Sequence, residues 1–362
     1  MSPTLTVLGV ETSCDETAAA VVRLGEGGRA EVLSSVVASQ IAVHAAYGGV
    51  VPEIAARGHV EVIDKVIAQA MREADVIFPE LDGVAATAGP GLVGGVMVGL
   101  SAAKAIALAC DLPLMAVNHL EGHAVSARLA DDVPYPFLLL LVSGGHCQLL
   151  AVDGIGACTR LGSTIDDAAG EAFDKIGATL GLPYPGGPAL ERLAEGGDAA
   201  RFALPRALLG RRDCDFSFSG LKTAAARVAE LQVRNQQDRK DLAASVQAAI
   251  AFQLTERTLR AMDVYALGRT EKLFVVAGGV AANDAVRMSL LAAAEDRGFD
   301  FAAPPLKYCT DNAAMIALAG AERLAAGVTD DLDAPARPRW PLDADAALNN
   351  PTHAAGRKGA KA

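Results

Sequence analysis

The first 110 residues alternate between short apolar runs and polar turns. The run TLTVLGVE (4–11) predicts a buried strand, and the polar turn SCDET follows it. Two further runs, TAAAVVRL and EVLSSVVAS, predict two more strands, so the chain opens with a β-meander. Next come a predicted helix from about residue 52 to 72, a strand that enters a glycine loop (LDGVAATAGPG), and a helix over 93–110.

A similar order of elements recurs after residue 133. The segment PYPFLLLLVSGGHCQLLAVD predicts a strand, a Ser-Gly-Gly-His turn and a second strand. The segment KLFVVAGGVAANDAVRMSLL predicts a strand, a Gly-Gly loop and a helix. Further helices are predicted at residues 166–180, 187–196 and 219–268 and in TDNAAMIALAGAERLAAG (310–327).

Two halves that each open with strand, polar turn and strand predict a duplicated α/β fold with two lobes and an interlobe cleft. Each turn alone is also compatible with a plain hairpin; three such loops in the same order favour the actin, Hsp70 and sugar-kinase (ASKHA) architecture. Turns of this kind can present backbone N–H groups to phosphates. The expected division is an N-terminal lobe at 1–117 plus about 312–330, a C-terminal lobe at 118–311, and an extended, partly disordered tail at 331–362.

The composition indicates the cellular location of the protein and limits the kinds of partner that it can bind. We find no run of eighteen apolar residues free of glycine, proline or charge and no basic leader with a cleavage site, so no membrane contact is expected. The six cysteines form no CxxC pair, which indicates a reducing, cytoplasmic environment. The formal net charge of −11 gives no general attraction to nucleic acid, so RNA binding would need a local patch. The densest basic segment before the tail comprises Arg201, Arg206, Arg211, Arg212, Lys222 and Arg227.

The stretch VNHLEGH contains two of the six histidines of the chain, His119 and His123, four residues apart. Positions i and i+4 share one face of a helix, so both rings can bind one ion. Glu121 lies about 200° around the helix from His119, so this is not the HExxH pattern of metalloproteases. An HxxxH pair by itself is weak support for a metal, and ordinary helix residues are the alternative.

A third ligand would have to come from a distant carboxylate, and TDNAAM supplies Asp311. The alternative role of Asp311, like that of Thr310, is to cap the last helix. Two neutral imidazoles and one carboxylate leave coordination positions open, which suits substrate binding to iron or zinc.

Three motifs, two of them with paired glycines, are candidates for ligand binding. In VSGGH (142–146), backbone amides between Ser143 and His146 could hold an anion. In DDAAGEAFDK most charges are expected to face solvent, and Asp174 is the candidate acceptor for hydroxyl groups. YPGGPALE cannot lie inside a helix and suits a wall that closes over a ligand.

No Ser-His-Asp order, reactive cysteine context or Walker motif is present, and Cys147 beside His146 would point to the opposite face of a strand. These features favour a transfer reaction without a covalent enzyme intermediate, so no catalytic nucleophile is expected.

Ten motifs in this order resemble the TsaD family, also called Gcp or YgjD, with Kae-type counterparts in archaea and eukaryotes. The resemblance covers about residues 5–343. One departure is Cys147, where the family usually has threonine. The motifs are GVETSCDET, YGGVVPEIAARGHVE, TAGPGLVGGVMVG, VNHLEGH, LVSGGH, DDAAGEAFDK, YPGGPALE, FSFSGLKTA, AGGVAAN and TDNAAMIA.

The resemblance implies a tRNA N6-adenosine threonylcarbamoyltransferase. Such an enzyme transfers threonylcarbamoyl from threonylcarbamoyl-adenylate to N6 of adenosine 37 in tRNAs that read ANN codons, and it releases AMP. His119, His123 and Asp311 match the family's ligands for one divalent metal, with Fe²⁺ favoured and Zn²⁺ possible. The resemblance also implies a TsaB-like paralogue and a TsaE-like ATPase as partners. The positions that match the donor contacts are Val142, Ser143, Gly144, Gly145, His146, Asp174, Gly187 and Asn283.

Three rival functions stay open at this point. The first is a metalloprotease, which the absence of HExxH disfavours. The second is an ATP-dependent kinase of the same fold, which would need an acceptor pocket. The third is a nucleotide-gated scaffold without catalysis, which would need no metal ligands.

Overall fold

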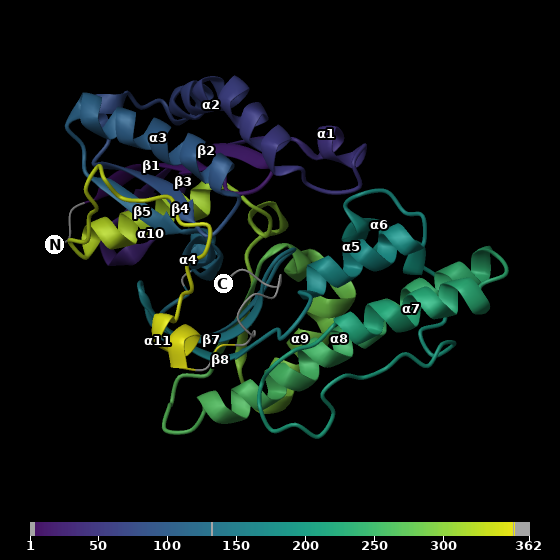
Figure 1. The fold of residues 1–362 in the computed structure, drawn as a ribbon. Helices are drawn as coiled ribbons and strands as arrows, with labels where there is room; N and C mark the ends of the chain where they lie inside the picture. The colour runs from purple at the N-terminus through teal and green to yellow at the C-terminus, as the bar shows by residue number, and fades with distance from the viewer. Residues whose placement is uncertain (1–3, 132, 350, 352–362) are drawn as a thin grey trace.

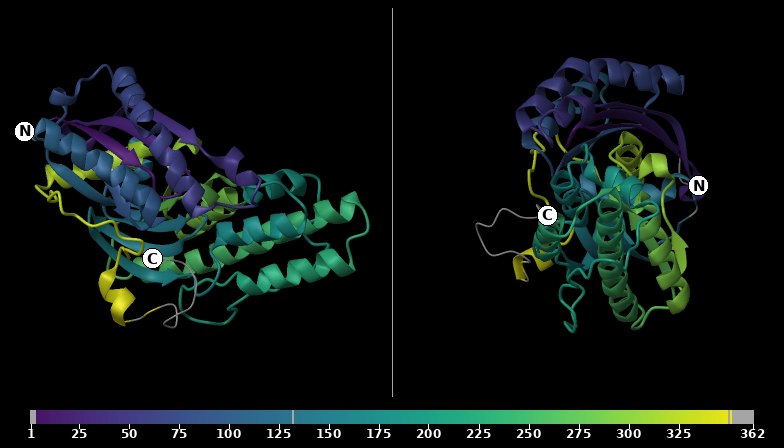
Figure 2. Two further views of the ribbon diagram at one scale, coloured as in Figure 1. Left: turned by 45° about the horizontal axis from the view of Figure 1, so that its top comes forward. Right: turned by 90° about the vertical axis from the view of Figure 1, so that its right-hand side faces the viewer.

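The structure is a computed structural model that describes residues 4–131, 133–349 and 351, and its chain folds into two lobes (Figure 1). The basic end of the chain, GRKGAKA (356–362), a further candidate for RNA contact, lies outside the described residues. Each lobe contains one five-stranded mixed sheet with helices packed on it. The long helices of the second lobe extend away from the first lobe, as Figure 2 shows from two further sides.

The first sheet has the strand order β3-β2-β1-β4-β5. Its first three strands are antiparallel neighbours, whereas β4 and β5 run parallel to β1. Helices α2 and α3 cover one face, and α10 packs against β1, β2 and β4. The bounds are β1 (Leu5–Glu11), β2 (Glu16–Leu24), β3 (Ala30–Ser39), β4 (Gly83–Gly89), β5 (Leu114–Asn118), α2 (Pro52–Ala74), α3 (Val93–Cys110) and α10 (Ala313–Ala325).

The second sheet repeats this topology with the order β10-β9-β6-β7-β8. Here β6, β7 and β8 are antiparallel neighbours, and β9 and β10 run parallel to β6. The strands are β6 (Phe137–Val142), β7 (Cys147–Gly154), β8 (Ala157–Ser163), β9 (Leu273–Ala277) and β10 (Asp300–Ala302); the helices are α5 (Ala169–Thr179), α6 (Gly186–Ala194), α7 (Ser219–Leu231), α8 (Gln236–Tyr265) and α9 (Asp284–Arg297).

Short helices lie between and after the main strands and helices of both lobes. One of them, α4, follows β5 directly and contains the two histidines of VNHLEGH. The set comprises η1 (Glu26–Gly28), α1 (Ile41–Ala45), η2 (Phe78–Glu80), α4 (His119–Val125), η3 (Ser126–Leu129), η4 (Gly279–Ala282), η5 (Leu306–Tyr308) and α11 (Ala344–Asn349).

The duplicated α/β topology confirms the fold class expected from the order of the glycine loops. The sequence pattern did not reveal β5, β8 or β10, which are short or carry mixed polar and apolar residues. The helix expected over 219–268 is two helices, because the chain leaves α7 after Leu231 and Asn235 caps a new helix by accepting from the Asp238 amide.

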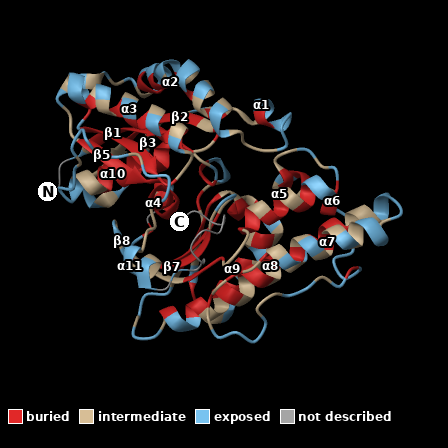
Figure 3. Ribbon diagram, in the orientation of Figure 1, coloured by how far each residue is buried: buried red, intermediate tan, exposed pale blue. Residues whose placement is uncertain are grey.

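Buried apolar residues lie on both faces of each sheet. Figure 3 shows that most of the strand residues are buried. Such two-sided burial explains why the central strands read as continuous apolar runs, for example Phe137 to Val142. By length and composition, α3 is the one helix among the described residues that could cross a membrane. Its buried face, which includes Val96, Leu100 and Ala103, packs on the first sheet.

The motif DDAAGEAFDK, which forms the start of α5 and the loop before it, was expected to turn most of its charges to solvent. The structure shows instead that its first residue is bound within the protein. Asp166 is half-buried and accepts hydrogen bonds from the hydroxyls of Ser217 and Ser219 and from the amides of Phe218 and Ser219. Although burial opposes its ionisation, these donors outweigh burial and lower the pKa of Asp166. Asp166 thereby fixes the first turn of α7 to the loop before α5.

We predict that Asp166→Ala lowers the free energy of unfolding by roughly 2 kcal/mol at neutral pH, because four donors lose their acceptor. Since the pKa is lowered in the folded state, this stabilisation is present above the unfolded-state pKa and is lost as pH falls towards the folded-state pKa. Denaturant titrations of both proteins between pH 3 and pH 8 measure the difference. The exposed Asp64 is the control, and Asp64→Ala should change stability by less than about 0.5 kcal/mol. Equal stability of Asp166→Ala and wild type at neutral pH would contradict this role.

Candidate metal centre and ligand cavity

The two histidines occupy a short helix at the carboxyl end of β5. Asn118 ends the strand and caps α4, because its side-chain oxygen accepts from the Leu120 amide at 2.9 Å. All seven residues of α4 are buried. His119 and His123 therefore project from a fixed backbone, with their ring centroids 4.7 Å apart.

Asp311 approaches both rings from the segment before α10. Its Oδ1 lies 3.5 Å from His119 Nε2 and 3.1 Å from His123 Nε2. The ligand atoms of the three residues all lie within 4.8 Å of one another. The structure thus brings Asp311 to two histidines that lie far from it in the sequence.

A second carboxylate orients the first histidine from the other side. Glu11, at the end of β1, is fully buried, and its Oε2 lies 2.9 Å from His119 Nδ1. Glu11 also accepts from the Ser13 amide and from the Thr87 hydroxyl, so its position is fixed by β1 and β4. A carboxylate on one ring nitrogen directs the other nitrogen towards an ion, as is usual for metal-binding histidines.

The charges of this cluster are mutually dependent. Burial disfavours the imidazolium of His119, but Asp311 and Glu11 outweigh burial and raise its pKa to about 9. Burial raises the pKa of Asp311, yet the two histidines reverse this effect and lower it. For Glu16, burial together with the neighbouring Asp311 and Asp15 raises the pKa to about 9. Several carboxylates therefore crowd one buried site that two imidazoles only partly neutralise.

This donor set fits a divalent transition metal. Two imidazole Nε2 atoms and one carboxylate oxygen converge on one point, and the arrangement leaves further positions for substrate or water. His123 is completely buried, although its Nδ1 atom has no hydrogen-bond partner among the described residues. Glu121 is turned away, as helical geometry predicts, and accepts from the Gly156 amide at 2.7 Å.

A cavity of about 400 Å³ lies between the lobes and includes His119 and Asp311 in its wall. The first lobe contributes the loop from Ser13 to Glu16 and the segment from Pro90 to Leu92. The second lobe contributes the turn from Ser143 to His146, Asp174, Gly187 and Asn283. All predicted donor contacts except Val142 thus line the same cavity as two of the three predicted metal ligands.

The Ser-Gly-Gly-His turn connects β6 to β7, and its structure limits which amides can bind a ligand. The Ser143 amide donates to the His146 carbonyl, and the His146 amide donates to the Ser143 hydroxyl. Gly144 and Gly145 are exposed towards the cavity. The expected anion site therefore reduces to the amides of these two glycines. Val142 is fully buried, and its carbonyl packs against Gly278, where a Cβ would lie 2.5 Å from that oxygen.

Asp174 and Asn283 have structural roles that the sequence did not reveal. One oxygen of Asp174 accepts from the amides of Gly186 and Gly187, at 2.7 and 3.3 Å, and so holds the YPGGP loop at the cavity. Burial outweighs these two donors and raises the pKa of Asp174. Asn283 caps α9 through the Val286 amide and donates to Gln247.

Sequence reasoning predicted the SCDET turn of the first lobe but named none of its residues as part of the site. Ser13, Cys14, Asp15 and Glu16 line the cavity, and the Ser13 hydroxyl lies 3.1 Å from His119 Nδ1. The polar turn SCDET immediately after a buried strand was the available signal, because the carboxyl ends of strands face the cleft in open α/β sheets.

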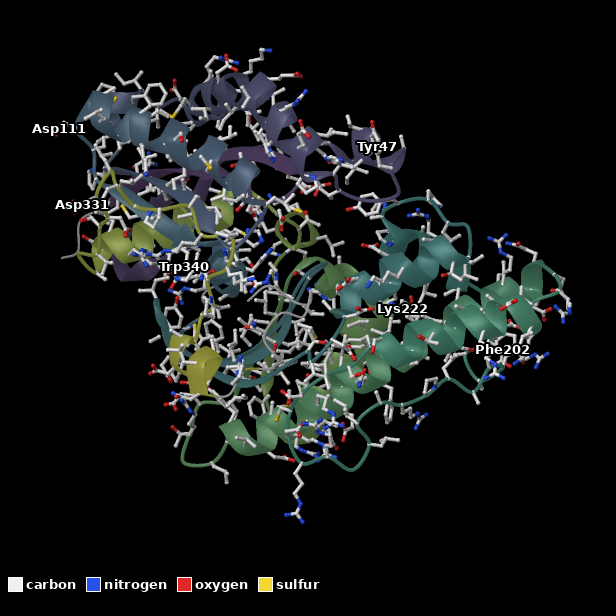
Figure 4. The ribbon with its side chains drawn as sticks, in the orientation of Figure 1. Tyr47, Asp111, Phe202, Lys222, Asp331 and Trp340 are labelled. Atoms are coloured by element: carbon white, nitrogen blue, oxygen red, sulfur yellow. The ribbon has the colours of Figure 1, made fainter. Side chains whose placement is uncertain are left out.

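The basic segment expected to contact RNA lies elsewhere in the second lobe. None of its six basic side chains, all of which are described, lines the cavity. Arg206 stacks on Phe252, and Arg211 pairs with Asp213. Phe202, which neighbours Arg201, lies on the side of the second lobe remote from the first (Figure 4).

Solved structures with this fold are similar to the chain over nearly its whole length. HypF of T. kodakarensis matches with a TM-score of 0.60 at 16% identity, over 91% of this chain and 49% of that one. Component A of the (R)-2-hydroxyglutaryl-CoA dehydratase of Acidaminococcus fermentans matches with a TM-score of 0.51 at 16% identity, over 89% of this chain and 99% of that one. These similarities support the two-lobed ASKHA-like fold.

Sequence relatives are far more similar. A tRNA N6-adenosine threonylcarbamoyltransferase of Caulobacter vibrioides is 71% identical, over 99% of this chain and 98% of its own length. Proteins of the same description from Maricaulis maris and Ruegeria pomeroyi are 57% and 56% identical, over 99% and 100% of this chain and 96% and 100% of their own lengths. The family model described as TsaD, tRNA N6-adenosine threonylcarbamoyltransferase, matches residues 31–318. The chain therefore belongs to the TsaD family of tRNA N6-adenosine threonylcarbamoyltransferases.

Proposed function

We propose that this acyltransferase moves the threonylcarbamoyl group of threonylcarbamoyl-adenylate to N6 of adenosine 37 in tRNAs that read ANN codons, and that a metal ion assists the transfer. The observation that carries this proposal is that His119 and Asp311 line one interlobe cavity together with Gly144 and Gly145. An anionic adenylate and a divalent cation are the ligands that suit these two groups of residues.

The metal site would use His119, His123 and Asp311, with Glu11 orienting His119. One divalent ion is proposed, with Fe²⁺ favoured and Zn²⁺ as the alternative, since imidazole and carboxylate ligands suit both. When bound, such an ion supplies Lewis-acid polarisation of acyl or phosphate oxygens. The residues around it position the ligand and exclude water.

The donor would lie along the second-lobe wall of the cavity. Gly144 and Gly145 are exposed residues, and their amides are suited to phosphate or carboxylate oxygens. Gly187, held by Asp174, and the η4–α9 junction at Asn283 would enclose the nucleoside. Because Asp174 already accepts two amides, its proposed contact with ribose hydroxyls uses its remaining acceptor capacity.

The chemistry fits a site without a nucleophile. The amino nitrogen of adenosine attacks the carbamoyl carbon, a C–N bond forms, the C–O bond to phosphate breaks, and AMP and a proton leave. The mixed anhydride is already activated, so positioning and charge stabilisation are the main requirements. Burial raises the pKa of the Cys147 thiol, and its side chain is fully buried, which disfavours it as a nucleophile.

The rival functions fit less well. A zinc protease of the HExxH type needs a glutamate beside the metal, whereas Glu121 is bound to Gly156 and to Arg323. A non-catalytic scaffold does not account for three converging metal-ligand side chains in the cleft. A TsaB-like paralogue, a TsaE-like ATPase and a cytoplasmic location remain part of the proposal through the family resemblance.

We predict that the purified protein binds one equivalent of Fe²⁺ or Zn²⁺ and that His119→Ala/His123→Ala binds none, because two of three ligands are removed. Elemental analysis after dialysis measures the metal content, and circular dichroism checks the fold. His146→Ala is the matched control, because His146 lines the same cavity but is not among the three converging residues, and it should retain the ion. A full equivalent of metal in the double variant would exclude this ligand set.

We also predict transfer activity that depends on this site. Protein incubated with tRNA, threonine, bicarbonate, ATP, a threonylcarbamoyl-adenylate synthase and the proposed partner proteins should produce threonylcarbamoyl-adenosine, detected by nucleoside mass spectrometry. The double histidine variant should lose at least about 100-fold in rate, the scale expected when an electrostatic contact to the transition state is removed. Modification at the wild-type rate by the variant would refute metal assistance. ATP turnover without tRNA and without product would favour the kinase alternative.

The basic segment gives a separate prediction about tRNA. Arg212 is exposed, whereas Arg211 is paired with Asp213 and Asp215. If the segment contacts tRNA phosphates, Arg212→Ala should weaken binding and reduce the slope of log K against log salt by roughly 0.7 to 0.9. Arg211→Ala is the matched control and should have the smaller effect. Filter binding at several salt concentrations measures both slopes, and unchanged affinity in Arg212→Ala would assign tRNA binding to another surface or to a partner.

A further inference from the structure

The segment after α10 runs back across the edge of the first sheet. The Asp330 amide donates to the Leu114 carbonyl, and an Asp330 carboxylate oxygen accepts from the Ala116 amide. The chain then passes β4 and α4 before it reaches α11 (Figure 1). The unpaired edge of β5 is thereby covered by the chain itself.

Residues 337–340, which we name the strap, bind three points that flank the proposed site. The Arg337 amide donates to the Ala88 carbonyl at 2.7 Å, at the end of β4. The Gly91 amide donates to the Pro338 carbonyl at 3.4 Å, and Gly91 lines the cavity. The Asn118 side chain donates to the Trp340 carbonyl at 2.9 Å, directly before His119.

The contact between the strap and β4 requires a glycine at position 89. A Cβ at this position would lie 1.9 Å from the Arg337 carbonyl oxygen, and φ is 140°, so a side chain is excluded by both space and conformation. Side chains support the same contact. Trp340, labelled in Figure 4, packs against the core of the first lobe. The Arg337 guanidinium lies 4.4 Å from its ring centroid.

Asn118 joins the strap to the metal-bearing helix. Its oxygen accepts from the Leu120 amide and so caps α4, and its nitrogen donates to the Trp340 carbonyl of the strap. One side chain, only 4% exposed, therefore contacts both α4 and the strap. A helix of seven residues has little stability of its own and depends on its caps and packing.

We propose that the strap is a positioning element, in which Trp340 acts through Asn118 to set the orientation of α4 and therefore of His119 and His123. Arg337 and Pro338 hold the neighbouring cavity wall in the same way. Because the strap lies outside the cavity and holds α4 and the cavity wall, release of the strap would make His119 and His123 less well ordered.

The chain offers a direct readout and a matched control. Trp340 is the single tryptophan of the sequence, so intrinsic tryptophan fluorescence reports only on the strap. Asn118→Ser keeps an N-cap oxygen but replaces the amide that donates to the Trp340 carbonyl with a shorter hydroxyl, which cannot reproduce both contacts. Asn235→Ser makes the same change at the cap of α8 in the second lobe, where Asn235 accepts from Asp238.

The experiment compares wild type, Asn118→Ser and Asn235→Ser by acrylamide quenching of Trp340 and by transfer kinetics. Asn118→Ser should show greater quenching and a kcat reduced roughly tenfold by misplacement of the site, with an unchanged KM for tRNA. Asn235→Ser should match wild type in both. Arg337→Pro removes both the N–H donated to the Ala88 carbonyl and the guanidinium over the Trp340 ring, and it leaves the residues of α4 unchanged, so it should reproduce the effects of Asn118→Ser.

Quenching needs no substrate, so it tests the strap independently of the proposed function, on which only the kinetic comparison rests. Wild-type quenching in both Asn118→Ser and Arg337→Pro would overturn the proposal. So would greater quenching in both variants with unchanged kcat, because the strap would then be attached without positioning the site.

Discussion

The contact between the Glu11 carboxylate and His119 is the interaction on which the candidate site depends most. Glu11 ends the central strand of the first sheet, and His119 begins the helix that follows the edge strand β5. Their 2.9 Å contact joins β1 to α4 and, through Thr87, to β4. Because Glu11 is fully buried, loss of its partner would leave an uncompensated charge in the core, at a cost of several kcal/mol.

This contact also explains why a cation suits the site. Glu11 binds one nitrogen of His119, so the other nitrogen is directed at Asp311 and His123. Burial, together with the neighbouring carboxylates of Asp311 and Asp15, raises the pKa of Glu16 to about 9. A divalent cation among these carboxylates would relieve a repulsion that two imidazoles only partly offset.

The duplicated topology of the two sheets explains why the second lobe also contributes to the cavity. The turn after β6 occupies the same topological position in the second lobe as the loop after β1 in the first, and both line the cavity. The loop of the first lobe therefore contributes the carboxylates of Asp15 and Glu16, and the turn of the second lobe contributes Gly144 and Gly145 beside His146. A ligand that carries both an acyl group and a phosphate can contact the two kinds of wall at once.

Features that depend only on residue spacing within one helix, strand or loop could be predicted from the local sequence. The facing of His119 and His123, the outward turn of Glu121 and the three repeated glycine loops all follow from helical or strand geometry. Asp311 was a candidate third ligand with helix capping as the alternative, the resemblance favoured the ligand role, and only the fold shows why it reaches the histidines. Features that depend on contacts between distant segments were not predictable, because no local pattern encodes them. Examples are the pairing of Glu11 with His119, the occupation of Asp174 by two glycine amides, and the strap at Asn118.

Anomalous diffraction from crystals grown with Zn²⁺ or Fe²⁺ tests the central claim most directly, namely that this cluster is a metal centre at one end of the ligand cavity. The account predicts one strong peak at about 2.0–2.2 Å from Nε2 of His119, Nε2 of His123 and an oxygen of Asp311. The account would be contradicted by crystals in which these three side chains are ordered but no anomalous peak lies between them at saturating metal.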